Sequence, residues 1–302
     1  MIADAPVASP VRPVAQLRSY ISLTKPRIME LLLVTTLPGM LLAADGWPRP
    51  VTLVTTLLGG ACATGAASVV NCIRDRDIDA IMERTRNRPL VTGAITVRAA
   101  SIFAMSLAAV GLALLLAFTT PLAAGLTAAS MLWYAGLYTS LKRSTRHNTV
   151  LGAAPGAAPV LIGATAVEGS IPPTAVAFFV VVFCWQMPHF WSLAMKYRDD
   201  YQRAGIPMLP VVASAPAVAA SCLPWAWTAV AASLVLPLLE PALGLIYTAA
   251  AVLSGGWFLA ESHALRRRAN SPETPLRSMR VFRASIIYLM VLGTALIIDI
   301  TL

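Results

Sequence analysis

The residues best suited to chemistry begin in one segment that follows a long apolar run. Asn71, Asp75 and Asp79 recur every four residues, so in a helix they share one face. Carboxylates one turn apart repel each other, and a divalent cation between them would remove that repulsion. Oxygen ligands that leave positions open for phosphate and water are typical of Mg²⁺ sites. The stripe therefore predicts a magnesium site, unless it is an ordinary mixture of acids and bases on a solvated helix end.

Basic residues suited to anionic oxygens accompany this stripe. Arg84 and Arg88 follow it directly, and guanidinium groups pair well with phosphate-type oxygens. Lys142 and Arg143 lie in a second basic segment. They could neutralise the charge of a leaving group, or they could only mark the cytoplasmic side of a membrane.

A second acidic segment, with the pair Asp199 and Asp200, follows another apolar run. Opposed acidic clusters at one end of a helical bundle could hold two metal ions that bridge a diphosphate. Aromatic residues, Trp185 among them, flank the polar segments and could shelter an allylic cation. Aromatic residues near helix ends, however, more often form an interfacial belt.

The composition indicates that a membrane surrounds these residues. Of the 302 residues, 57% are hydrophobic and 12% are charged, whereas about 25% are charged in an ordinary soluble domain. This excludes a disordered chain, a disulfide scaffold and a soluble nucleic-acid-binding protein. The four cysteines lie in or beside apolar runs without CxxC spacing, which is typical of small buried residues.

Apolar runs long enough to cross a bilayer predict an all-α membrane protein with nine transmembrane helices. The expected spans are 28–44, 51–72, 99–119, 121–141, 148–167, 171–195, 212–238, 241–260 and 282–301. All basic residues except Arg49 then fall on one side of the membrane. The positive-inside rule places the N-terminus in the cytoplasm and, for an odd number of spans, the C-terminus outside. We expect a cytosolic arm (1–27) and one intramembrane domain (28–302), with active-site segments at about 71–90, 138–148 and 185–210.

Several strings of this sequence resemble those of a known enzyme family. Asn71, Asp75 and Asp79, followed by Met82-Glu83-Arg84-Thr85 and Arg88-Pro89-Leu90, resemble the first aspartate-rich motif of the UbiA superfamily of intramembrane prenyltransferases. Four further strings are similar to the branch of that superfamily that farnesylates haem. They begin at Leu23, Tyr138, Trp185 and Asp200. The resemblance extends from about residue 18 to about residue 300.

The resemblance implies a nine-helix UbiA-like bundle with a membrane-facing cavity. It also implies Mg²⁺-dependent transfer of farnesyl from farnesyl diphosphate to a vinyl group of haem B, giving the haem O of terminal oxidases. Haem A synthase or terminal oxidase assembly proteins would then be partners. Lys196 stands where the wider superfamily has the first aspartate of its second motif, which argues against a symmetric two-metal site.

The roles that the resemblance implies fall into four groups. The metal ligands would be Asp75, Asp79, Asp199 and Asp200. The catalytic group would be Asn71, Asp75, Asp79 and Asp200. The diphosphate would be bound by Lys25, Arg27, Arg84, Arg88, Lys142, Arg143 and Lys196. Haem would contact His189 and Trp185, although a lone histidine at a helix end is more often a polar residue satisfied by its neighbours.

Two other functions fit the same residues. A prenyltransferase acting on an aromatic quinone precursor would keep the magnesium–diphosphate site and change the acceptor pocket. A multi-span transporter of anionic metabolites would use the basic cytoplasmic face. Transporters, however, usually bury ionisable groups near the bilayer centre, whereas these spans contain little beyond Glu30 and His189. Because the arm lacks an Arg/Ser-rich amphipathic leader, we expect a bacterial inner membrane, with the site facing the cytoplasm.

Overall fold

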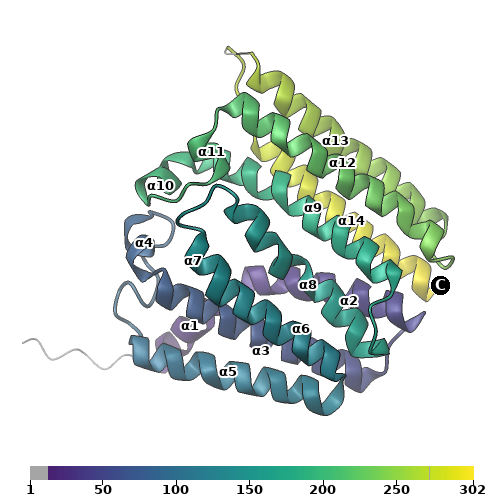
Figure 1. Ribbon diagram of the computed structural model, residues 1–302, viewed down its shortest axis with the longest axis horizontal. Helices are drawn as coiled ribbons and strands as arrows, with labels where there is room; N and C mark the ends of the chain where they lie inside the picture. The colour runs from purple at the N-terminus through teal and green to yellow at the C-terminus, as the bar shows by residue number, and fades with distance from the viewer. Residues whose placement is uncertain (1–12, 272) are drawn as a thin grey trace, which may run out of the picture.

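The computed structural model describes residues 13–271 and 273–302, and within these ranges its regular structure is entirely helical (Figure 1). The long helices are α2 (Pro26–Ala44), α3 (Pro50–Arg74), α5 (Val97–Phe118), α6 (Pro121–Leu132), α8 (Asn148–Glu168), α9 (Pro173–Lys196), α12 (Ala215–Leu239), α13 (Leu245–Ala269) and α14 (Met279–Thr301). The short ones are α1 (Pro13–Leu23), α4 (Arg76–Ile81), α7 (Thr139–Leu141), α10 (Arg198–Arg203), α11 (Leu209–Val212) and the π-helix η1 (Trp133–Tyr138). The all-α prediction is confirmed.

The helix boundaries follow from local chemistry. Four of the long helices have a proline in their first turn: Pro26, Pro50, Pro121 and Pro173. Proline is tolerated there because the N–H groups of the first turn have no acceptor within the helix. The side chain of Thr96 accepts a hydrogen bond from the N–H of the third residue that follows it, which caps α5. These signals lie in the sequence, so the starts of the long helices agree closely with the predicted spans.

Seven helices are long and apolar enough to cross a membrane by length and composition: α2, α3, α5, α8, α9, α12 and α14. The predicted span 121–141 is helical throughout, but η1 divides it into α6, η1 and α7. The predicted span 241–260 lies largely in α13, whose last turns also carry Glu261 and three arginines. The number of crossings and the sides of the two termini remain predictions.

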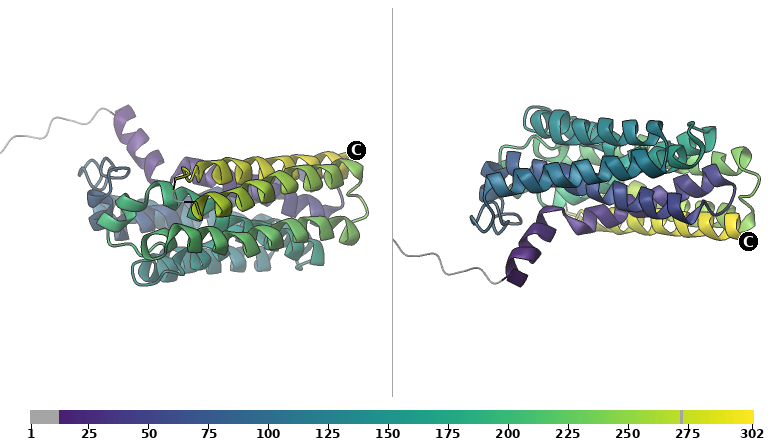
Figure 2. Two further views of the ribbon diagram at one scale, coloured as in Figure 1. Left: turned by 90° about the horizontal axis from the view of Figure 1, so that it is seen from above. Right: turned by 90° about the horizontal axis from the view of Figure 1, so that it is seen from below.

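The long helices lie side by side along the long axis of the molecule, and α1 projects from one end (Figure 2). Pairs of them pack closely: α2 on α8, α3 on α5, and α9 on α12. At Gly39 of α2, an added Cβ would stand 2.1 Å from the carbonyl oxygen of Val160 on α8. Only glycine permits this approach, which is typical of membrane helices.

The short helices α4 and α10, which carry charged residues, gather with α11 at one end of the bundle. α4, α10 and α11 lie opposite the end where the C-terminus is found (Figure 1). Of the predicted cytosolic arm, residues 1–12, Arg12 included, lie outside the described residues, and Pro13–Leu23 form α1. The division into an arm and one intramembrane domain remains a prediction.

Candidate active site

A cavity of about 470 Å³ lies among α2, α3, α4, α6, η1, α8 and α9. Its charged and amide-bearing lining residues at the end of α3 are Lys25, Asn71, Asp75, Asp79, Arg84, Arg88, Lys142 and Asn148. The remaining walls are mostly small or apolar, with residues such as Leu32, Ala63 and Ile162. The cavity is therefore amphipathic, with a charged end and a long apolar interior.

Asn71, Asp75 and Asp79 lie on the same wall of this cavity. Each is buried, with 2–4% of its surface exposed. The helix expected to run through them is interrupted, because α3 ends at Arg74 and α4 begins at Arg76. The turn is held by a 2.8 Å hydrogen bond from the N–H of Asp79 to the carbonyl oxygen of Asp75. The break leaves both carboxylates at the charged end.

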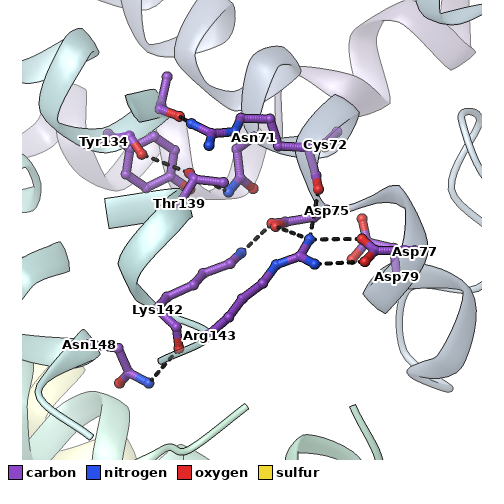
Figure 3. A network of polar contacts seen from close by, with 12 residues as sticks. Asn71, Cys72, Asp75, Asp77, Asp79, Tyr134, Thr139, Lys142, Arg143 and Asn148 are labelled. Carbon is purple, nitrogen blue, oxygen red and sulfur yellow. Dashed lines mark hydrogen bonds and ion pairs between the residues drawn. The ribbon is translucent and has the colours of Figure 1, made fainter. Parts of the chain in front are cut away.

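A network of cations surrounds the first carboxylate, as Figure 3 shows. Lys142 donates a hydrogen bond to Asp75 Oδ2. Arg143 forms two hydrogen bonds with the exposed Asp77, of 2.6 and 2.7 Å, and stands 3.6 Å from Asp75 Oδ1. The second buried carboxylate, Asp79, accepts a 2.5 Å hydrogen bond from Arg88. Both carboxylates that line the cavity are thus paired with cations.

One oxygen in this network has no hydrogen-bond partner. Asp75 Oδ1 is buried, and no donor reaches it within the described part of the chain. A buried acceptor left without a partner is costly, so this oxygen is suited to bind a cation. The described residues contain no group of three or more His, Cys, Asp or Glu side chains that could hold a metal ion. Asp75 and Asp79 could therefore hold Mg²⁺ only if phosphate oxygens or water complete its coordination.

The ion pairs also shift the pKa values of the groups outside the helices that could span a membrane. The hydrogen bonds from Arg143 hold the pKa of Asp77 at about 2, and the same contact raises the pKa of Arg143. Burial lowers the pKa of Lys142, and the neighbouring Asp75 opposes this effect. The Asp77–Arg143 pair therefore stays charged across the neutral range.

The π-helix η1 carries Tyr134 and Tyr138 and is followed by Thr139, to which the sequence had assigned no role. Thr139, which follows it, donates a 2.7 Å hydrogen bond to the carbonyl oxygen of Tyr134 and accepts one of 3.0 Å from Asn71. Tyr134 and Tyr138 stack at 5.3 Å between ring centroids, and both line the cavity. π-Helices occur frequently at functional sites. The sequence offers one signal for Thr139, which is a polar residue near the end of the predicted apolar span 121–141.

Lys25 reaches the site from a strained position. Its φ of 55° is left-handed, which is unfavourable for any residue other than glycine. From there, immediately before α2, its ammonium donates a hydrogen bond to Asn71 Oδ1. Strained residues concentrate at functional sites. The amide of Asn71 thus joins Lys25 on one side to Thr139 on the other.

The second acidic segment does not join the first at the cavity wall. Asp199 and Lys196, both exposed, line a separate pocket of about 360 Å³ with Asp200. Asp200 Oδ1 accepts hydrogen bonds from the N–H of Glu83 and from Arg203, each of 3.0 Å. Arg84 lines both pockets. The four carboxylates of the expected metal site therefore line two pockets that meet at Arg84, and Asp200 Oδ1 holds the segment after α4.

The structure also places His189, which was expected to contact haem, outside the cavity lining. Its ring is stacked between Trp185, at 4.4 Å, and Phe282, at 4.5 Å, and Nδ1 is hydrogen bonded to Ser285. His189 does not line the cavity, whereas Trp185 does. The expected contact of His189 with haem therefore has no support in this arrangement. Arg27, which is exposed, is also absent from the cavity lining.

Comparison with known proteins identifies the class of this enzyme. Residues 32–286 match the UbiA prenyltransferase family, and the chain belongs to that family. A structure described as a digeranylgeranylglyceryl phosphate synthase superimposes with a TM-score of 0.78 at 17% identity, covering 94% of this chain and 98% of that one. A UbiA homologue from Archaeoglobus fulgidus bound to DMAPP and Mg²⁺ gives 0.67 at 18% identity, covering 92% and 99%.

Closer relatives narrow the class to one branch. The chain is 52% identical to the protoheme IX farnesyltransferase of Salinispora tropica, over 94% of this chain and 89% of that protein. It is 47% identical to the protoheme IX farnesyltransferase of Clavibacter michiganensis subsp. michiganensis, over 93% and 92%. Within the UbiA family, the chain therefore groups with the protoheme IX farnesyltransferases.

Proposed function

We propose that the protein transfers the farnesyl group of farnesyl diphosphate to a vinyl group of haem B, which yields haem O. The observation that carries this proposal is the amphipathic cavity, which joins a charged end to a long apolar interior. A prenyl diphosphate has the same two parts. The relatives at 47% and 52% identity carry the name of this activity, and they favour haem over an aromatic quinone precursor as the acceptor.

Asp75 and Asp79 are the residues that would hold Mg²⁺, since both line the charged end and Asp75 Oδ1 accepts no hydrogen bond, with Arg143 no nearer than 3.6 Å. Bound there with the diphosphate, the metal would supply positive charge to the leaving group. Asp199 and Asp200 line the other pocket. In this proposal Asp200 positions the segment after α4 through its bond to the N–H of Glu83.

The cationic side chains of the cavity bind and stabilise the departing diphosphate. Lys25, Arg84, Arg88 and Lys142 all line its charged end. As the bond between farnesyl C1 and oxygen breaks, the electron pair leaves with the diphosphate, and these side chains neutralise the growing charge. Preorganised charge of this kind is usually the largest single contribution to catalysis. Asn71 acts as a positioning residue, because it binds Lys25 and Thr139 together.

The apolar part of the cavity protects the reactive carbon. The stacked rings of Tyr134 and Tyr138 line the wall near Lys142, and aromatic faces stabilise cations. The vinyl group of haem B donates its electron pair to farnesyl C1 and becomes a cation beside the macrocycle. Water adds to that cation and loses a proton to the diphosphate or to solvent. The product is the hydroxyethylfarnesyl haem.

We place this site at the cytoplasmic face of a bacterial inner membrane, in a bundle of nine crossings with the N-terminus inside. The seven long apolar helices and the distribution of basic residues support this placement. The division into a cytosolic arm (1–27) and one intramembrane domain (28–302) belongs to the same proposal. Haem A synthase and terminal oxidase assembly proteins are the partners that haem O would require.

The decisive experiment incubates the purified protein in lipid nanodiscs with haem B, farnesyl diphosphate and Mg²⁺. We expect pyrophosphate release together with a haem whose mass has increased by one farnesyl group and one hydroxyl group. If haem stays unmodified and a phenolic acid supplied in its place is prenylated, the acceptor is an aromatic quinone precursor and the proposal of haem as the acceptor is wrong. Absence of pyrophosphate release with either acceptor would contradict a prenyltransferase and favour transport.

A further inference from the structure

The cavity continues far beyond its charged end along one face of α3. The α3 residues that line it, together with Asp75 directly after the helix, are Thr56, Gly60, Ala63, Thr64, Ala67, Ser68, Asn71 and Asp75. At a rise of 1.5 Å per residue, Ala67 lies about 12 Å from Asp75, Gly60 about 22 Å and Thr56 about 28 Å. Thr56 is fully buried and is the α3 lining residue farthest from Asp75.

The charged end fixes where a prenyl chain would begin. Asp75 Oδ1 is buried and has no hydrogen-bond partner among the described residues, and it lines this same cavity. A diphosphate held at that oxygen through a cation would occupy about the first 5 Å of the length of the cavity. The apolar chain would extend from there along α3, because the other end of the cavity lacks charged residues.

The length of the substrate can be compared with this scale. An isoprene unit contributes four main-chain bonds of about 1.5 Å, or about 5 Å of extended length. With the diphosphate included, a geranyl chain would end about 15 Å from Asp75 and a farnesyl chain about 20 Å from it. The third isoprene unit of farnesyl would therefore lie beside Ala63, at about 18 Å, and its end would come within about 2 Å of the level of Gly60 along the helix axis, close enough to contact a side chain there.

Gly60 differs from the adjacent glycine in what it faces. An added Cβ at Gly60 would meet only Leu33 Cδ2, at 3.9 Å, and Gly60 lines the cavity. An added Cβ at Gly59 would stand 2.8 Å from Leu115 Cγ on α5, so Gly59 serves helix packing. The space at Gly60 therefore belongs to the cavity, and a side chain there would shorten it without disturbing a helix contact.

We infer that Gly60 sets the longest prenyl chain that the cavity accepts, by leaving space for the third isoprene unit. This inference rests on the proposed function, since it assumes that a prenyl diphosphate binds with its phosphates at Asp75. The length of the prenyl chain is then selected by α3, through the absence of a side chain at Gly60.

The test compares Gly60→Leu and Ala67→Leu with dimethylallyl, geranyl and farnesyl diphosphates, using pyrophosphate release as the readout. For Gly60→Leu we expect kcat/KM to fall about tenfold or more with farnesyl diphosphate and to change little with geranyl diphosphate, since pockets discriminate size by such factors. Ala67→Leu should also reject geranyl diphosphate and retain only the dimethylallyl substrate. The matched control is Gly125→Leu, because Gly125 lies on α6 outside the cavity lining with no atom near its added Cβ.

A smaller substitution at the same position controls for the possibility that Gly60→Leu is inactive only because it fails to fold. Gly60→Ala has space for its methyl group and favours the helix, and we expect its ratio of farnesyl to geranyl use to lie between those of the wild type and Gly60→Leu. Equal losses for all three substrates, or undiminished use of farnesyl diphosphate by a folded Gly60→Leu protein, would overturn the inference. Failure of the proposed function is distinct, because the wild type would then leave haem unmodified whatever the chain-length profile.

Discussion

Replacing Asp75 with asparagine removes the charge of the buried carboxylate while keeping its size. We expect kcat for pyrophosphate release to fall by about 10²–10³, the usual loss when one preorganised group is removed from such a site. The dependence on Mg²⁺ should move to higher concentration, because Asp75 Oδ1 is a buried oxygen that accepts no hydrogen bond. Both quantities can be measured in nanodiscs by titrating Mg²⁺ at saturating farnesyl diphosphate.

The same substitution also affects stability, and the two effects must be separated. The side chain of Lys142 is only 12% exposed, and removing one partner of a buried ion pair costs about 3–5 kcal/mol. The double variant Asp75→Asn/Lys142→Met removes both charges, so it should regain most of the thermal stability while remaining inactive. Recovery of activity together with stability would show that Asp75 serves only the fold.

The matched control is Asp77→Asn, on the same segment. The Asp77 side chain is 65% exposed and lies outside the cavity lining, and its ion pair with Arg143 is worth at most about 1 kcal/mol. We expect its activity to stay within about fivefold of the wild type. If Asp77→Asn lost as much activity as Asp75→Asn, the reasoning from burial and cavity lining would be refuted.

Three further perturbations test other parts of the site. The pKa of Asp77 is held at about 2 by Arg143, so the stabilisation from this pair should be complete at neutral pH and be lost as the pH falls from about 4 towards 2. Unfolding curves of the wild type and Asp77→Asn should therefore converge below pH 2, and a difference that persisted there would contradict the pairing. His189→Phe should preserve haem farnesylation, because His189 lies outside the cavity lining; loss of haem binding in a folded variant would restore the histidine as a ligand. Arg88→Gln should raise the KM for farnesyl diphosphate about tenfold or more, since hydrogen bonds to charged groups contribute about 1.5–3 kcal/mol, whereas an unchanged KM would place the diphosphate elsewhere.

The sequence predicted the stripe of Asn71, Asp75 and Asp79 because helical periodicity decides which residues share a face. Periodicity cannot decide whether two distant segments face the same space, which depends on tertiary packing. Asp200 was predicted to share a metal site with Asp75 and Asp79, whereas in the structure it lines the neighbouring pocket, and its bond to the N–H of Glu83 had no signal in the sequence. The stacking of His189 against Phe282 joins residues far apart in the chain and was equally hidden.

The division of the predicted span 121–141 has a different cause. A π-helix changes the hydrogen-bond register of the backbone without changing the apolar character of its side chains. Trp133–Tyr138 therefore read as part of a continuous span. The start of α6 was predictable, because Thr120 caps it and Pro121 occupies its first turn.

The left-handed backbone of Lys25 has a consequence for engineering. Holding a lysine there costs about 1–2 kcal/mol compared with a relaxed conformation, and glycine would adopt the same backbone readily. The hydrogen bond from Lys25 to the buried Asn71 offsets this strain. Glycine at position 25 would relieve the strain but would leave the buried Asn71 Oδ1 without its donor, at a cost of about 1–3 kcal/mol, so replacing Lys25 would slow turnover with no net gain in heat resistance.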